Sequence, residues 1–297
     1  MAINSKLTTI EDACLDIRDA IKESQRNLAE GSITTLGNDI RTLNNGAYVY
    51  RWVNNNGVYT LEKDLCTGTV PASAYLGKTS IIAVIFSENV TSIGNSAFKN
   101  CTNLQYIALP RSLTSIQASA FEGCTALTNL NITSSNSLTI ASRGFYNCTK
   151  LTTVSSNISP QSISVAEYAF RYCPLISFPT EKLTSITGQY VFHQHRMTNM
   201  EFNSTLTSIS SRAFISLLSN GTSQTIIMRN TTPPTLGNNQ VFHRDNGSGS
   251  FYINTGIKIY VPYSADHSVL NAYKTATNWT VYANYIFELN EDGSIPT

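Results

Sequence analysis

A repeated motif constrains the fold of this 297-residue chain more than any other feature of its sequence. Its clearest copy, residues 91–110, has the pattern Thr-Ser-Ile-x-x-x-Ala-Phe-x-x-Cys-x-x-Leu-x-x-Ile-x-Leu-Pro. Eight copies place an aromatic anchor at the same point, and successive anchors are 22 to 28 residues apart. The anchors are Tyr75, Phe98, Phe121, Phe145, Phe170, Phe192, Phe214 and Phe242. A single copy cannot bury its apolar residues alone, so the copies are expected to stack and share one core.

The spacing within each copy predicts how it folds. A period of about 20–29 residues with Leu and Ile at short fixed offsets is typical of leucine-rich-repeat solenoids. Alternation in the segment Leu-x-x-Ile-x-Leu directs Ile107 and Leu109 inward and Tyr106 outward, as on a strand. The Ala-Phe pairs are expected on the returning side, with their rings stacked as a spine. The predicted fold class is an α+β repeat, a leucine-rich-repeat solenoid with stacked parallel β-strands, preceded by a small N-terminal helical segment.

The motif resembles the BspA-type leucine-rich repeat of bacterial surface and gut-associated proteins. The resemblance extends over about residues 70–287 and includes the end of the repeat region, where Ile-Tyr-Val-Pro at 259–262 and Ala-Tyr-Lys at 272–274 precede Trp279. It implies a binding scaffold and leaves the ligand open.

Four of the six cysteines share one position of the motif, three residues after the Phe anchor. A ladder spread along a rod cannot converge on a zinc ion, so these residues are expected to be reduced, buried and important only for packing. On this interpretation Cys124→Ser costs more stability than Cys124→Ala, because it buries an unpaired hydroxyl. The ladder consists of Cys101, Cys124, Cys148 and Cys173, while Cys14 and Cys66 are assigned no role.

The N-terminal segment, residues 1–43, predicts two amphipathic helices, at residues 5–29 and 33–43. Apolar residues alternate there by three and four, which is the heptad pattern of a helical seam. A lone amphipathic helix of this length is marginal in water, so its stripe must be covered. A hairpin folded on itself or on the solenoid would cover it, and so would an oligomeric coiled coil such as a trimer, or docking to another protein. The expected attachment residues are Leu7, Ile10, Ile17, Ile21 and Leu28.

The same segment is similar to the N-terminal region of tail-associated proteins from phages of gut bacteria. The similarity lies in Ser-Lys-Leu at 5–7, Ile-Arg-Asp-Ala-Ile at 17–21 and Leu-Gly-Asn-Asp-Ile-Arg-Thr-Leu at 36–43. It implies attachment to virion tail proteins.

A solenoid needs a cap at each end. Residues 44–65 predict an aromatic β-hairpin cap, with Tyr48, Tyr50 and Trp52 on one side of a strand and a turn at Asn-Gly. The solenoid is assigned to residues 66–262, with a flexible loop indicated at residues 246–249. Residues 263–297 form the predicted C-terminal cap and tail, with a helix in residues 264–287. The residues expected to seal this end are Leu270, Tyr273, Trp279, Tyr282 and Ile286.

The sequence offers little support for catalysis. Charged residues make up 13% of the chain and the net charge is +1, which argues against nucleic-acid binding. No apolar run is long enough for membrane insertion, and residues 1–13 lack the pattern of a secretory signal. In the pair His193 and His195, the first is expected at an exposed, variable position, like His243, and the second in the cysteine position. We therefore predict neither an enzyme nor a bound metal or cofactor.

The most favoured function is adhesion. Short polar groups between the buried strand residues suit recognition of a host cell-surface glycan or protein. The first hypothesis is a phage tail fibre or tail-tip protein located in the virion; the second is a bacterial cell-surface or secreted adhesin, and the third is an intracellular interaction module. The expected ligand-binding residues are Tyr106, Asn129, Asn131, Thr153, Ser155, Asn199, Glu201 and Thr225.

Overall fold

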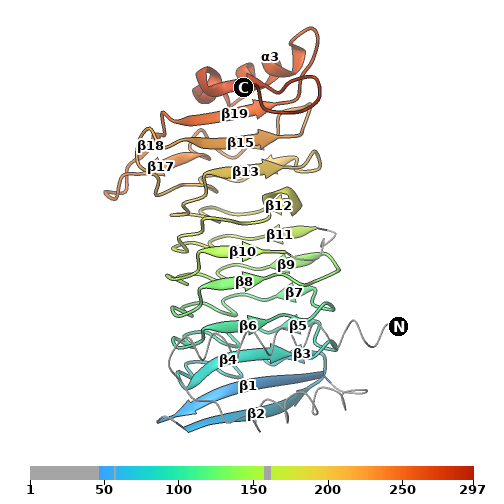
Figure 1. Ribbon diagram of the computed structural model, residues 1–297, viewed down its shortest axis with the longest axis vertical. Helices are drawn as coiled ribbons and strands as arrows, with labels where there is room; N and C mark the ends of the chain where they lie inside the picture. The colour runs from blue at the N-terminus through green and yellow to red at the C-terminus, as the bar shows by residue number, and fades with distance from the viewer. Residues whose placement is uncertain (1–46, 57, 157–161) are drawn as a thin grey trace.

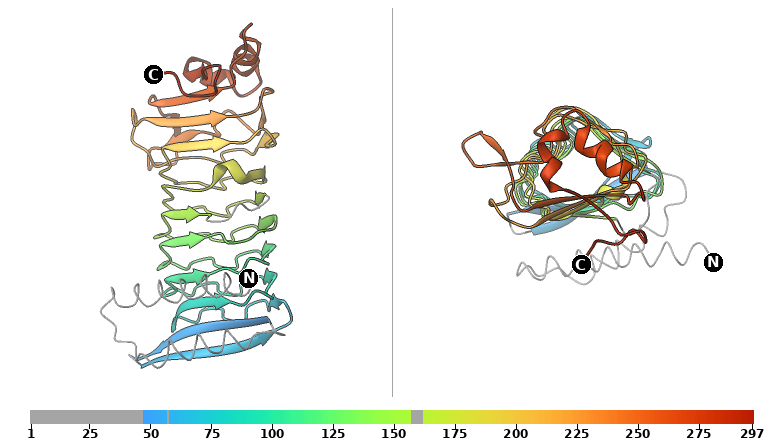
Figure 2. Two further views of the ribbon diagram at one scale, coloured as in Figure 1. Left: turned by 45° about the vertical axis from the view of Figure 1, so that its right-hand side comes forward. Right: turned by 90° about the horizontal axis from the view of Figure 1, so that it is seen from above.

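The chain winds into a single elongated coil, seen from the side in Figure 1. The computed structural model describes residues 47–56, 58–156 and 162–297. A typical turn of the coil adds a strand to one sheet, a short strand to a second sheet and an aromatic turn between them, so the view along the rod is a ring (Figure 2). The predicted solenoid of stacked parallel strands is confirmed. The predicted N-terminal helices, with Cys14 and the attachment residues Leu7, Ile10, Ile17, Ile21 and Leu28, lie outside the described residues.

The first sheet has the strand order β10-β8-β6-β4-β1-β2. From β4 to β10 its strands are parallel, and Ala108, Asn131 and Ser155 pair in one row across them. Leu130 and Val154 point inward and are buried, as the alternation predicts. The strands are β1 (Ala47–Asn55), β2 (Val58–Cys66), β4 (Ile81–Phe86), β6 (Tyr106–Ala108), β8 (Asn129–Asn131) and β10 (Thr153–Ser155).

The second sheet, with the order β12-β11-β9-β7-β5-β3, was not predicted. The Thr-Ser-Ile run of the motif forms it, and Ile93, Ile116 and Ile140 pair in one buried row. Because each strand is only two to four residues long, its sequence carries almost no alternation. The strands are β3 (Thr69–Val70), β5 (Ser92–Ile93), β7 (Ser115–Ile116), β9 (Leu138–Ile140), β11 (Ile163–Val165) and β12 (Leu183–Ile186).

The first sheet ends at β10, and a third sheet continues the rod in the order β13-β15-β19-β20. Between them lie Pro174 and Pro179, which cannot donate backbone hydrogen bonds to a ladder, and the 3-10 helix η1 (Thr180–Lys182). The remaining strands are β13 (Asn199–Phe202), β14 (Ser208–Ile209), β15 (Gln224–Met228), β16 (Thr235–Leu236), β17 (His243–Asp245), β18 (Phe251–Ile253), β19 (Ile257–Val261) and β20 (Ile286–Glu288).

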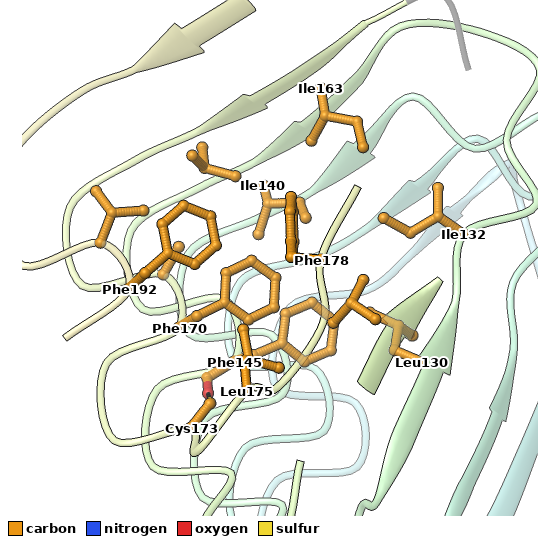
Figure 3. Close-up of a cluster of buried hydrophobic side chains, with 14 of the residues drawn as sticks. Leu130, Ile132, Ile140, Phe145, Ile163, Phe170, Cys173, Leu175, Phe178 and Phe192 are labelled. Atoms are coloured by element: carbon orange, nitrogen blue, oxygen red, sulfur yellow. Dashed lines mark hydrogen bonds between the residues drawn. The ribbon is translucent and has the colours of Figure 1, made fainter. Parts of the chain in front are cut away.

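The predicted aromatic spine runs through the core. Phe145 stacks on Phe121 and on Phe170 with ring centres 5.2 Å apart on each side and planes within 10° of parallel. Figure 3 shows Phe145, Phe170 and Phe192 in one column, with Leu130 and Ile140 meeting them from the two sheets. Each buried ring contributes roughly 1.5–3 kcal/mol by burial, and stacking adds to it.

The cysteine ladder is buried and reduced, as predicted, but its role is not packing alone. Cys101, Cys124, Cys148 and Cys173 are fully buried free thiols. Each thiol points at the carbonyl oxygen of the preceding anchor; the Cys124 sulfur lies 3.2 Å from the Phe98 oxygen. A hydroxyl at this position therefore has an acceptor, so the premise that Cys124→Ser buries an unpaired hydroxyl is wrong. Burial raises the pKa of the Cys124 thiol well above its usual value, which keeps it protonated.

Both ends of the spine are closed. β1 and β2 form an antiparallel hairpin, and β1 pairs with β4, which places buried Trp52 beside the first turn. The side chains of Tyr48 and Tyr50 lie outside the described part of the chain. At the other end, the ring centres of Trp279 and Phe242 are 6.0 Å apart. The Trp279 indole N–H donates to the Pro234 carbonyl at 2.8 Å. Tyr273, Tyr282 and Ile286 are buried there as predicted, and Leu270 packs partly buried against them.

The C-terminal helix is shorter than predicted. In place of a helix through residues 264–287, α3 (Ser268–Thr275) is followed by the 3-10 helix η2 (Thr280–Tyr285) and then by β20. Asn278, between the two helices, has a φ of 65°, a left-handed conformation that interrupts a helix.

Candidate ligand-binding surfaces

The predicted surface residues divide between two sheets. Tyr106, Asn129, Asn131, Thr153 and Ser155 lie on β6, β8 and β10 of the first sheet, where Asn129 and Ser155 are exposed. Asn129 pairs with Thr153, and Asn131 pairs with Ser155, so they form two rows across the strands. These five residues therefore form one polar face.

The other three predicted residues lie on the third sheet, beyond residues 174–182, where the first sheet has ended. Asn199 on β13 pairs with Thr225 on β15, which pairs in turn with Lys258 on β19. The Glu201 carboxylate accepts a hydrogen bond from Arg229 at 2.7 Å, and both side chains are about two-fifths exposed. The break at residues 174–182 separates this group from the first-sheet face.

The aromatic turns carry a second pattern, which the sequence interpretation missed. In the turns anchored by Tyr75 through Phe192, the residues two before and two after the anchor have positive φ, such as 56° at Ser96 and 60° at Asn100. This conformation directs their N–H groups along the rod, where they donate to carbonyls of the next turn at 2.9 and 2.7 Å. Gly, Asn and Ser occupy these positions in the early turns, whereas later turns carry Arg143, Tyr168, Tyr172, Tyr190, Gln194 and Arg212.

Bulky side chains at left-handed positions are unfavourable by about 1–3 kcal/mol each and often mark functional sites. In this protein Tyr172 and Tyr190 stack with Arg171, whose guanidinium lies 4.6 Å from the Tyr172 ring centre and 4.9 Å from the Tyr190 ring centre. Arg212 approaches the Tyr190 ring to 5.6 Å. Its guanidinium also donates to the Tyr190 hydroxyl and the Gln240 amide oxygen, both at 2.8 Å. The arginines are thus held in place by aromatic rings and hydrogen bonds.

The β17–β18 hairpin turns this stack into a cleft. The hairpin follows directly after the last anchor, Phe242, and it projects from the side of the rod (Figures 1 and 2). Between hairpin and stack lies a cavity of about 680 Å³. The loop signal at residues 246–249 marked the tip of this hairpin, although it did not indicate a cleft. The walls of the cavity include Arg171, Tyr172, Tyr190, Gln194 and Arg212 from the turns, and Ser250, Phe251 and Tyr252 from the hairpin.

His193 lies at the inner wall of the cleft and is only 4% exposed, so its predicted exposure is wrong. Phe251 of the hairpin covers it, with ring centres 6.0 Å apart. Among the described residues neither ring nitrogen has a hydrogen-bond partner, although Nε2 lies 3.4 Å from Oδ2 of Asp245. Burial and the nearby Arg171 guanidinium lower the pKa of His193 to about 4, against the opposing effect of Asp245. The imidazole is therefore neutral at pH 7.

The other two histidines of these turns are also buried. His243 was expected to be exposed, but it is 8% exposed and its Nδ1 lies 2.9 Å from the Tyr282 hydroxyl of the C-terminal cap. His195 occupies the cysteine position in the core, as predicted. Its Nδ1 accepts from the Met197 N–H at 3.0 Å, and its Nε2 donates to the Phe214 carbonyl at 3.2 Å. Burial lowers the pKa of His195 to about 4, so this neutral tautomer is fixed.

Two further findings concern residues 47–56, 58–156 and 162–297. No cluster of three or more His, Cys, Asp or Glu side chains within these ranges is arranged to hold a metal ion. Within the same ranges, no helix has the length and apolar character required to cross a membrane.

Comparison with known proteins identifies the repeat. The family described as "BspA type Leucine rich repeat region (6 copies)" matches residues 68–195 and 163–291. Among solved structures, a leucine-rich repeat protein from Bacteroides ovatus is similar, with 16% identity over 82% of this chain and 75% of that chain and a TM-score of 0.28. A search of curated proteins gave no match. Most of the chain is therefore spanned by one repeat family, and the protein belongs to the BspA-type leucine-rich-repeat family.

Proposed function

We propose that this protein is a non-enzymatic adhesion protein that recognises a glycan or a protein on a cell surface. The observation that supports it most is the polar face of the first sheet, where Asn129, Asn131, Thr153 and Ser155 stand in register. Neighbouring strands repeat at about 4.8 Å, so the face offers regularly spaced hydroxyl and amide groups. Such groups bind polar surfaces directly or through water. The assignment to the BspA-type leucine-rich-repeat family also supports a binding function.

A panel of cell-surface glycans and proteins, probed with the full chain, tests this proposal. Once a ligand is found, Thr153→Lys should weaken binding at least tenfold, because it places a long charged side chain on the polar face, directly beside Asn129. Thr139→Lys is the matched control, since Thr139 is an exposed threonine on β9 of the second sheet. Equal losses from both variants, or a loss from Thr139→Lys alone, would contradict the assigned face.

A narrower form of the proposal places the protein in a phage tail, attached to virion tail proteins through residues 1–43. It is supported by the sequence resemblance of that segment and by its heptad pattern of apolar residues. Deleting residues 1–43, or replacing Ile17 and Ile21 by Asp, should abolish self-association and assembly, because unpaired charges are costly to bury in a helical seam. Light scattering and tail-protein capture measure this. A full-length monomer that captures no tail component would contradict the narrower proposal.

The family also supports a bacterial cell-surface or secreted adhesin. Antibody labelling separates the two locations: a virion protein is found on purified particles, whereas an adhesin is found on intact cells or in the medium. Retention inside intact cells, away from both, would support the intracellular interaction module instead and would contradict recognition of a cell surface.

A further inference from the structure

The cleft beside the β17–β18 hairpin has the features of a binding site for an anion. The described residues contain no carboxylate within 4.0 Å of the guanidinium groups of Arg171 or Arg212. Asp245, the acidic residue of the cleft, is buried toward His193, and one of its oxygens accepts the Gly247 N–H at 2.8 Å. Two cations held in place without an acidic partner favour a negatively charged ligand.

The remaining walls suit a sugar ring. Tyr190 and Phe251 are neighbouring rings, with centres 6.2 Å apart and planes tilted by 56°, and together they form an aromatic part of the cleft wall. Gln194, Gln240 and Ser250 add amide and hydroxyl groups that can donate to and accept from ligand hydroxyls. An apolar ring face edged by hydroxyl groups matches this combination better than a bare inorganic anion, which needs no aromatic wall.

Two independent observations mark the cleft as more than a surface irregularity. Tyr190, Gln194 and Arg212 occupy left-handed backbone positions at which the early turns carry Ser, Gly or Asn. Under the cleft, the His193 ring is almost fully buried, and neither nitrogen makes a hydrogen bond within the described residues, although Nε2 lies 3.4 Å from Asp245. Phe251 of the hairpin packs against that ring, and His193 lines the cleft beneath it.

We propose that the cleft binds the carboxylate-bearing sugar of an acidic glycan, with Arg171 and Arg212 facing the carboxylate and Tyr190 and Phe251 packing against the ring. The guanidinium planes offer paired N–H donors to a planar carboxylate. This inference rests on the proposed recognition function and adds the chemical class of one ligand. It uses a surface separate from the first-sheet face.

Calorimetric titration of the full chain tests the proposal. The probes are trigalacturonate, a glucuronate-containing hyaluronan tetrasaccharide and sialyllactose, each compared with its methyl ester, which keeps the ring and removes the charge. At least one acid should bind, and its ester should bind about tenfold to a hundredfold more weakly, as expected for losing a charge-assisted contact. Arg171→Gln and Arg212→Gln should each produce a similar loss. Arg111→Gln is the matched control, because Arg111 does not line the cleft.

Several outcomes would overturn the inference: no acid binds, acid and ester bind equally, or inorganic phosphate binds as tightly as the sugar. Thermal unfolding of each variant shows whether it is folded, and Arg212→Gln provides a second test if Arg171→Gln unfolds. If Thr153→Lys abolishes acid binding while both arginine variants retain it, the sheet face is the site and only this inference fails. If the chain binds other surface ligands but no acidic sugar, again only this inference fails, whereas the absence of any ligand would also contradict the proposed function.

Discussion

Replacing His195 by Cys, the residue that four other turns carry at this position, should make the protein less sensitive to acid. His195 is fully buried, and its neutral form makes two hydrogen bonds, to the Met197 N–H and the Phe214 carbonyl. Protonation would remove the first bond and place a charge in the core. The surroundings are the Phe214 ring, 6.1 Å away, and the neutral His193, so no described acidic group compensates this charge.

The magnitude follows from the pKa. The pKa of His195 is about 4 in the folded protein, against about 6.5 when unfolded. Because the folded pKa is lowered, its contribution to stability is present above pH 6.5 and is lost as the pH falls toward 4. At 1.36 kcal/mol per pH unit, this one residue removes about 3 kcal/mol over that window.

Urea unfolding at pH 7.5 and at pH 4.5 measures the effect. At pH 7.5, His195→Cys should be less stable than the wild type, because the smaller side chain leaves a cavity. At pH 4.5 that difference should shrink or reverse by about 2–3 kcal/mol, since the variant no longer takes up this proton on unfolding. Cys148→Ala also leaves a cavity but involves no group that titrates in this range. Its free energy of unfolding should therefore be lower than that of the wild type by the same amount at both pH values. Parallel pH dependences for His195→Cys and the wild type would refute the reasoning.

Three further predictions concern the core and its cap. Phe145→Leu should lower the free energy of unfolding by about 2–4 kcal/mol, because it removes two ring stackings at 5.2 Å and leaves a void; calorimetry measures it, and a loss under 1 kcal/mol would contradict a continuous spine. Cys124→Ala should cost about 1–2 kcal/mol and Cys124→Ser no more than that, since the hydroxyl can donate to the Phe98 carbonyl; a clearly larger cost for serine in urea unfolding would show that the thiol contributes packing alone. Trp279→Phe should cost about 1–2 kcal/mol by removing the bond to the Pro234 carbonyl, and unchanged urea unfolding would show that this bond does not stabilise the cap.

The spine and the thiol ladder were predictable because each repeats one residue type at an equivalent position of the motif, although the interval between copies varies. Phe98 through Phe242 and Cys101 through Cys173 occupy equivalent places in successive turns, so a single rule places all of them. The second sheet was not predictable in this way, because strands such as Ser92–Ile93 are too short to show alternation. Their pairing depends on the stacking of whole turns.

The errors at His193 and His243 have a different cause. If the repeats were equivalent, the residue that follows each anchor would have the same environment in every turn. In the early turns this residue is the half-buried Lys99 or Glu122. The β17–β18 hairpin and the C-terminal cap cover the later positions, and both come from segments far along the chain. The cleft did leave a signal in the sequence. The position two before the anchor changes from Ser96 and Ser119 to Tyr190 and Arg212, which is unexpected in a left-handed turn.

Hydrogen exchange on the full chain, with and without a surface ligand that it binds, tests the central claim of recognition through these surfaces most directly. The claim predicts added protection in two places: the loops that flank β6, β8 and β10, and, for an acidic glycan, the β17–β18 hairpin with the turns that carry Tyr190 and Arg212. Protection confined to the second sheet, or no change anywhere at saturating ligand, would contradict it.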